Sequence, residues 1–241
     1  MGVSSTRAWP SLIAASALAV ICAVAAVVAA NVAANELTRG PTLAELESAA
    51  DTEVAERWRT WPSGRIFPGT LVYTAEQGGE EKAKRVGISP ATGCTAAVDK
   101  KARKALSEAG CRAALRATYL DALGGVVVTV GVLVLPDELR AERAVSLFSQ
   151  GGDPVPGLRA LAFKSTVADR FTDAGRQAGS VRQAGPYVVM TTAGQVDGRT
   201  AKSIGGSRPS IFAFASELGE RVLSALSRPG VPSCGEQEWQ C

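Results

Sequence analysis

The sequence predicts an α+β fold in which an N-terminal transmembrane helix is followed by an antiparallel sheet with helices packed on one face. Two features of the 241 residues carry this prediction: no charged residue lies between Arg7 and Glu36, and pairs of short apolar runs alternate with amphipathic segments. Runs that follow each other across a short turn pair as antiparallel strands, and the segments between the pairs can cover the sheet as helices.

The N-terminal apolar segment has the length of a membrane anchor. Residues 12–34 are almost entirely Ala, Val, Leu and Ile, and about 20 such residues cross the hydrocarbon core of a bilayer. A cleaved signal peptide is the alternative, because Val32-Ala33-Ala34 would permit cleavage before Asn35. The apolar stretch exceeds the roughly 7–15 residues of a signal-peptide core, which favours an uncleaved anchor over residues 11–35.

Charge at the two ends of this segment predicts its orientation. Arg7 and the free amino terminus precede the span, while Glu36 follows it closely. Because cytoplasmic flanks are enriched in positive charge, residues 1–10 are expected to be a short cytoplasmic tail and the rest of the chain to lie outside. The predicted localisation is therefore the cell membrane, with a single pass and an extracytoplasmic C-terminal domain.

The five cysteines support this orientation. Four of them follow the span, where an oxidising compartment pairs cysteines as disulfides, although sequence alone allows three connectivities. Cys22 lies within the span and is expected to stay free, because Ile21 before it argues against lipid attachment. Without a Cys-x-x-Cys spacing or a histidine, structural bridges are favoured over a metal site. Short local loops favour two bridges, Cys94–Cys111 and Cys234–Cys241.

The composition excludes several functions. The absence of histidine rules out a Ser-His-Asp or Cys-His nucleophile system within one chain. A net charge of +3, short basic runs flanked by acidic residues, and 5% aromatic residues argue against a nucleic-acid partner. The chain has no Walker A loop, no Gly-x-Gly-x-x-Gly motif and no Gly-x-Ser-x-Gly motif. The sequence therefore predicts no catalytic residue, no cofactor and no metal ligand.

Residues 36–60 are predicted to form a stalk helix. Apolar residues at three- and four-residue steps give it one apolar stripe, which favours packing on the following domain over a coiled coil. Residues 61–228 form the predicted extracytoplasmic α+β domain, and residues 229–241 a tail that a local disulfide closes. The stripe of the stalk helix consists of Leu43, Leu46, Ala50, Val54 and Trp58.

Within the domain, apolar runs and turn residues define strands and helices. Residues 126–135 are nearly all Val and Leu, which predicts a central strand buried on both faces. Residues 172–179 are predicted to be an exposed loop, and residues 181–196 a strand region bent near Gly185-Pro186. An uninterrupted apolar stripe makes residues 210–227 the clearest helix. The other predicted strands cover residues 65–73, 84–89 and 112–120, and the other predicted helices cover residues 99–109 and 137–149.

Four short motifs resemble those of a known group of proteins. They read WPSGRIFP at residues 61–68, VGISP at 86–90, GCR at 110–112 and DGR at 197–199. In these motifs and in its Ala-, Arg- and Val-rich composition, the chain resembles uncharacterised single-pass envelope proteins of high-GC actinobacteria. The resemblance implies an envelope location and a single-pass topology, and it supplies no activity or catalytic residues.

The leading functional hypothesis is a membrane-anchored extracytoplasmic binding or assembly module of the cell envelope, without enzymatic activity. Its expected partners are the membrane, through the N-terminal helix, and another envelope protein; the oligomeric state is left open. The alternative is an envelope hydrolase that uses a Ser-Lys pair or two carboxylates. A concave pocket that joins such groups favours the hydrolase, and a flat surface with an exposed apolar patch favours the binding module. The candidate groups are Lys164-Ser165, Lys202-Ser203, Asp169, Asp173 and Asp197.

Overall fold

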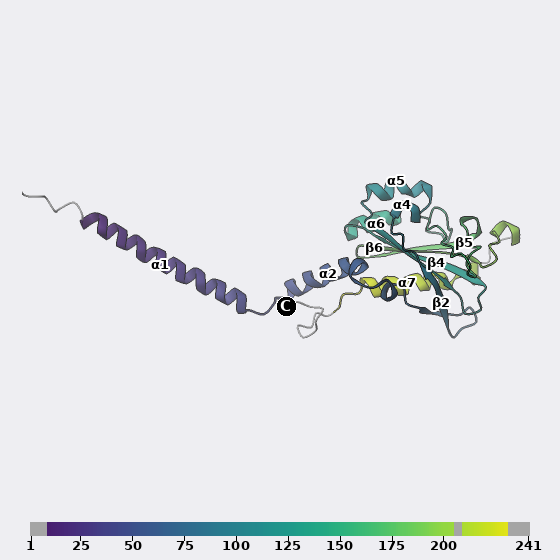
Figure 1. Ribbon diagram of the computed structural model, residues 1–241, viewed down its shortest axis with the longest axis horizontal. Helices are drawn as coiled ribbons and strands as arrows, with labels where there is room; N and C mark the ends of the chain where they lie inside the picture. The colour runs from purple at the N-terminus through teal and green to yellow at the C-terminus, as the bar shows by residue number, and fades with distance from the viewer. Residues whose placement is uncertain (1–8, 205–208, 231–241) are drawn as a thin grey trace, which may run out of the picture. The chain divides into compact units, whose positions relative to one another are not determined.

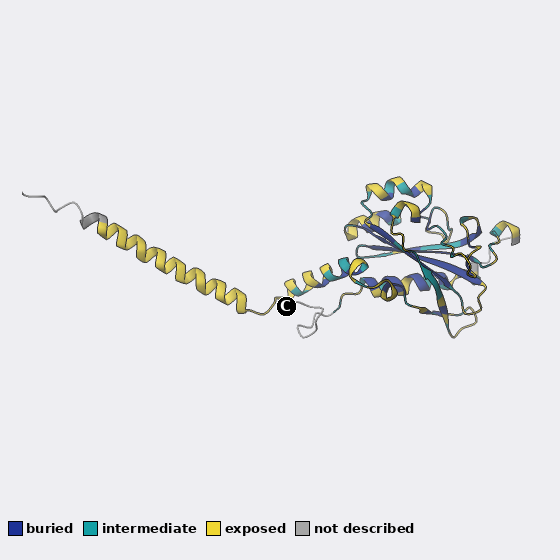
Figure 2. Ribbon diagram, in the orientation of Figure 1, coloured by how far each residue is buried: buried dark blue, intermediate teal, exposed yellow. Residues whose placement is uncertain are grey.

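The computed structural model describes residues 9–204 and 209–230, and residues 49–231 form a compact unit separate from the N-terminal segment. In that segment, α1 (Trp9–Thr38) has exposed side chains from residue 12 onward (Figure 1, Figure 2). Among the described residues, α1 is the one helix that is long and apolar enough to cross a membrane, judged by length and composition. The predicted apolar N-terminal helix is therefore present.

The compact unit is built on a six-stranded sheet in which every neighbouring pair is antiparallel. The strands lie in the order β1-β2-β3-β4-β6-β5, so the final hairpin adds to the sheet through its second strand. The predicted α+β class is confirmed. The strands are β1 (Thr70–Thr74), β2 (Glu80–Ile88), β3 (Ala113–Leu120), β4 (Val126–Val134), β5 (Arg176–Ala184) and β6 (Tyr187–Gln195).

The strand region predicted over residues 181–196, with a bend near Gly185-Pro186, forms most of the final hairpin of β5 and β6. Gly185 lies in its turn with a φ of +53°, a left-handed conformation that glycine adopts at no steric cost, so the chain reverses there. A short 3-10 helix, η1 (Asp173–Gly175), leads directly into β5, whose first residues Arg176 and Gln177 are buried. The prediction of an exposed loop over residues 172–179 was therefore wrong.

β4 is the centre of the sheet, and all nine of its residues are buried, as its run of Val and Leu predicts. Successive side chains of a strand point to opposite faces. On the first face, Val128 and Val130 join the largest apolar cluster, while on the second face Leu133 and Val127 join two separate, smaller clusters. Both faces of the sheet therefore need a cover that excludes water.

Helices provide that cover on both faces, which corrects the expectation of helices on one face (Figure 1). The physical reason is β4, because a strand with two apolar faces cannot leave one of them to water. The first face is covered by α2 (Leu43–Thr60) from residue 49 onward, α3 (Ser63–Ile66) and α7 (Phe214–Ser227). The second face is covered by α4 (Cys94–Ala97), α5 (Lys100–Glu108) and α6 (Glu138–Val145).

Several element boundaries also differ from the predictions, because β2 begins at Glu80 and α6 ends at Val145. The strand predicted over residues 65–73 begins only at Thr70, because α3 occupies the preceding turn. The helix predicted over residues 210–227 is divided into a 3-10 helix, η3 (Pro209–Phe212), and α7. Another 3-10 helix, η2 (Ala201–Ile204), follows the turn at residues 197–199.

The second half of α2 is an integral part of the sheet domain. The carbonyl of Val54 accepts a hydrogen bond from the Tyr187 hydroxyl of β6 at 2.5 Å. Arg57, which is 5% exposed, donates from Nη1 to three carbonyls at the end of α7. Because the last carbonyls of a helix lack intrahelical partners, a guanidinium there satisfies them and complements the helix dipole. The three acceptors are the carbonyls of Ala225 (3.1 Å), Leu226 (3.1 Å) and Arg228 (2.7 Å).

The Tyr187 hydroxyl predicts how the domain responds to alkali. Burial raises the pKa of Tyr187 to about 12, above the value of about 10 for an exposed tyrosine. The folded state therefore holds this proton more tightly than the unfolded state does. Its contribution to the free energy of unfolding is fully present below about pH 10 and is lost as the pH rises toward about 12. We expect the urea midpoint to fall over that interval, and to fall less steeply in Tyr187→Phe. Tyrosinate absorbance that develops at pH 10 in the folded wild-type protein contradicts the prediction.

A disulfide joins Cys94 to Cys111, as the sequence predicts. Cys94 begins α4 and Cys111 follows α5, so the bridge ties the start of this segment to the start of β3. For a sequence separation of 17 residues, the chain-entropy model gives a stabilisation of roughly 3 kcal/mol. The other predicted pair, Cys234 and Cys241, lies outside the described residues. Cys22 is free and exposed on α1.

Candidate functional site

The second face of the sheet carries a band of polar side chains between its two apolar clusters. One cluster lies under α5 and α6, and the other gathers around Val127 and Phe171. Between them, the strands present buried arginine and threonine side chains. A polar band in the middle of a buried face needs hydrogen-bond partners above it. Its members are Arg116 and Thr118 of β3, Thr129 of β4, Arg176 of β5 and Thr192 of β6.

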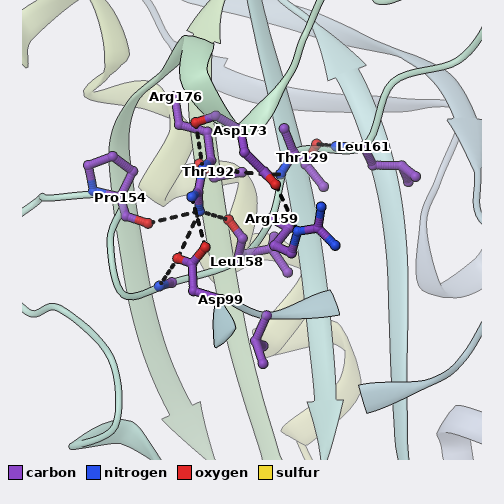
Figure 3. Close-up of polar contacts among 12 residues, drawn as sticks. Asp99, Thr129, Pro154, Leu158, Arg159, Leu161, Asp173, Arg176 and Thr192 are labelled. Atoms are coloured by element: carbon purple, nitrogen blue, oxygen red, sulfur yellow. Dashed lines mark hydrogen bonds and ion pairs between the residues drawn. The ribbon is translucent and has the colours of Figure 1, made fainter. Parts of the chain in front are cut away.

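The chain between α6 and β5 crosses this band and supplies the partners. The Thr118 hydroxyl donates to the carbonyl of Leu161 at 2.7 Å. The amide of Leu161 donates to the Thr129 hydroxyl at 3.1 Å (Figure 3). Gly131 of β4 makes the close approach possible, since a Cβ at that position would lie 2.5 Å from Cδ1 of Leu158. The sheet therefore holds this segment by both hydrogen bonds and packing.

Arg176 is the most connected side chain of the site. Its two terminal nitrogens bind both carboxylate oxygens of Asp99, at 3.1 and 2.9 Å (Figure 3). Only 4% of its side chain is exposed. The same guanidinium donates to the backbone carbonyls of Leu158 at 2.8 Å, Pro154 at 3.2 Å and Asp173 at 3.1 Å. Bidentate guanidinium–carboxylate pairs are strong and geometrically specific. Arg176 thus fastens β5 to the start of α5 and to the crossing segment.

Both aspartates of the site are committed to structural bonds. Asp99 also accepts from the amide of Gly157 at 2.8 Å. Asp173 accepts from Nε of Arg159 at 2.7 Å and from the amide of Ala160 at 2.9 Å. These carboxylates are therefore paired with cations and backbone donors, and not with each other as a carboxylate dyad requires.

Arg116 differs from every other member of this site. Its residue is 8% exposed, its Nε is buried without a partner, and its side chain makes no hydrogen bond or ion pair within residues 9–204 and 209–230. Burial lowers the pKa of its guanidinium, the nearby positive charge of Arg159 lowers it further, and the negative charge of Asp173 opposes these effects. Three arginines share two aspartates here, which leaves the site with one more positive than negative charge.

The residues considered for hydrolase chemistry lie elsewhere. Lys164-Ser165 and Lys202-Ser203 are exposed, and so is Asp169. Asp197 binds the Nε of Arg199 at 2.5 Å and also accepts from its amide, and these bonds lower the pKa of the carboxyl. Of these candidate residues, only Asp173 lies in the polar site, where it accepts hydrogen bonds from Arg159 and from the amide of Ala160.

A cavity of about 410 Å³ lies beside the edge strand β5. Its wall contains Ser180 and Ser216 but neither lysine of the Ser-Lys candidates. It also contains none of the three candidate aspartates. The cavity is lined by residues 150–153, 177–182, 212–213 and 215–216, together with Thr191.

Sequence reasoning missed the arginines of the polar site. A signal was present in β3, where Arg116 and Thr118 interrupt an otherwise apolar strand at a spacing of two residues. β4 repeats the signal, because Thr129 and Gly131 fall on the same face as each other. Two adjacent strands with polar or small residues on one face indicate a polar site on that face.

Comparison of the chain with protein-family models, with curated proteins and with solved structures gives no match. The class of protein is therefore argued from the fold and from the geometry of the site. The relevant features are an apolar helix, an α+β domain with an internal disulfide, and a buried site that carries one surplus positive charge.

Proposed function

We propose that the chain is a single-pass membrane protein whose α+β domain is a non-enzymatic binding or assembly module on the extracytoplasmic side of a cell envelope. The observation that carries the proposal is α1, whose apolar side chains between Leu12 and Val32 are exposed by about 55–65%. An apolar helix of this length is suited to lipid, since its backbone groups are satisfied internally.

The location outside the cytoplasm is supported by two independent features. The Cys94–Cys111 disulfide is typical of oxidising compartments, because cytosolic thiols are kept reduced. Arg7 precedes the apolar segment, and positive charge on this flank favours a cytoplasmic amino terminus. The resemblance to single-pass envelope proteins of high-GC actinobacteria agrees with this orientation.

The positions of the lysine and aspartate side chains favour a binding role over hydrolysis. A hydrolase of this kind needs a serine beside a lysine, or two carboxylates, facing one cavity. The cavity beside β5 is lined by neither Lys164 nor Lys202. The aspartates of the polar site are held by arginines in bonds that maintain the fold. We propose another envelope protein as the partner.

Topology is tested with two reporters fused after Cys241, one that folds only after export and one that fluoresces only in the cytoplasm. We expect the exported reporter to be active, the cytoplasmic reporter to be dark, and the fusion to stay in the membrane after an alkaline wash. Deletion of residues 12–34 is the matched control and should reverse both reporters. Cytoplasmic fluorescence of the full chain contradicts the orientation, and release by the wash contradicts an uncleaved anchor.

A further inference from the structure

The unpaired charge of Arg116 is the feature of the domain that its fold leaves unexplained. The other buried arginines are fully engaged: Arg176 binds Asp99, and Arg57 binds Glu53 and the end of α7. A buried charge without a partner is destabilising, and its cost is met only when a counterion or hydrogen-bond acceptor reaches it. Buried charged residues without a partner cluster at functional sites.

The geometry places a second guanidinium next to Arg116. Arg116 of β3 pairs in register with Gly131 of β4, so the two residues share the second face of the sheet. Leu158 fills the space above Gly131, and Arg159 is the next residue along the chain. The two arginines therefore lie close together, in agreement with the electrostatic effect of Arg159 on the Arg116 pKa.

Arg159 also has hydrogen-bonding capacity to spare. Its Nε binds Asp173 at 2.7 Å, and its Nη1 makes only a long contact of 3.5 Å to the carbonyl of Ala96. No bond of its Nη2 occurs within the described part of the chain. About 40% of its side chain is exposed, so a ligand can reach it from solvent. The pair thus combines a buried donor with an accessible one.

We propose that Arg116 and Arg159 form a binding site for a carboxylate group. One surplus positive charge matches the single negative charge of a carboxylate, and a phosphate dianion would exceed it. The planar fork of a guanidinium fits a carboxylate through two parallel hydrogen bonds. The inference deepens the proposed binding function, because it names the chemistry of the ligand. The carboxylate site does not depend on the membrane topology, so separate experiments test the two proposals.

The test measures the melting temperature of the full chain in nonionic detergent with sodium acetate or with sodium chloride at equal ionic strength. At an acetate concentration about tenfold above its dissociation constant, we expect the wild-type melting temperature to rise by about 3–6 °C over chloride. Arg116→Met should show no acetate effect. In chloride, it should melt at or above the wild-type temperature, because methionine keeps the apolar stem and removes the unpaired charge.

Two further variants make the test specific. Arg182→Met removes the same charge from a side chain that is 55% exposed and paired with Glu220, so it should keep the acetate effect. Arg159→Met should lose the effect, because the site then loses one of its two guanidiniums and its surplus positive charge. An Arg116→Met protein that melts lower in chloride or fails to fold makes Arg116 structural and overturns the proposal. An acetate effect of equal size in all four proteins overturns it as well.

The source of the carboxylate is tested with peptides. A short peptide with a free C-terminal carboxylate is compared with its amidated form and with acetate, and the side-chain Nε–H signal of Arg116 is followed by NMR. Displacement of this signal by the free peptide at concentrations at least tenfold lower than acetate supports a protein carboxylate. If the free peptide and acetate shift the signal at equal concentrations, the result supports a small organic acid. A signal that neither probe displaces overturns the carboxylate site.

Discussion

Replacing Arg176 with methionine is expected to lower the free energy of unfolding by about 3–5 kcal/mol, the usual cost of breaking a buried ion pair from one side. The substitution leaves the carboxylate of Asp99, whose side chain is 16% exposed, without its cation. It also leaves the carbonyls of Leu158 and Pro154 without a donor. Methionine preserves most of the side-chain volume, so the loss is expected to come from the unpaired polar groups and not from a cavity.

Arg182→Met is the matched control for Arg176→Met. Arg182 lies on the same strand and loses the same charge, but its side chain is 55% exposed and its ion pair with Glu220 spans 3.3 Å at the surface. Exposed pairs contribute little, so we expect a change within about 0.5 kcal/mol. Urea unfolding of both variants gives the comparison. Equal midpoints would show that the hydrogen bonds of Arg176 do not contribute to stability.

The central strands of the fold could be predicted from the sequence because their signals are local. The Val- and Leu-rich run of residues 126–135 identifies β4, and the short turn before it identifies the hairpin with β3. The same run also indicates helices on both faces, since a strand with two apolar faces requires two covers. The expectation of helices on one face followed from the order of the elements alone, which does not specify the side on which each helix packs.

The position of the last hairpin could not be predicted in the same way. β6 pairs with β4 across more than 50 residues, and no local pattern distinguishes this arrangement from one in which β5 is the inner strand. The apolar residues of the segment 157–175 recur with neither a strand nor a helix period. The segment is held instead by individual side-chain hydrogen bonds of Thr118, Thr129 and Asp173. Such bonds depend on tertiary geometry and leave little trace in hydrophobic periodicity.

The polar site shows the same limit. An arginine within an apolar strand is visible in the sequence at Arg116, but its lack of a partner is visible only in three dimensions. Arg176 lies in a segment of small and polar residues that is typical of an exposed loop, and it is buried because Asp99 reaches it from the start of α5. The Cys94–Cys111 bridge was predictable because a short loop limits the alternatives.

Leu218→Ala is expected to lower the free energy of unfolding by about 2–5 kcal/mol, a large share of the ~5–15 kcal/mol of a typical domain. Leu218 is fully buried on α7, within the apolar cluster on the first face of the sheet. Its truncation removes apolar contact area and leaves a cavity, because α7 is held at its C-terminal end by Arg57 and at its N-terminal end by the bond from the Thr74 amide to Glu217. A helix fixed at both ends cannot move inward to fill the space.

Glu220→Ala provides the control on the same helix. The side chain of Glu220 is 55% exposed and pairs with Arg182 at the surface, so its replacement should leave the melting temperature within about 2 °C. Leu218→Ala should lower it by roughly 5–15 °C. The comparison also bears on function, because both substitutions place alanine on one helix and leave the polar site untouched. An unchanged melting temperature in Leu218→Ala, combined with loss of partner binding, would make the apolar stripe of α7 a docking surface instead of core.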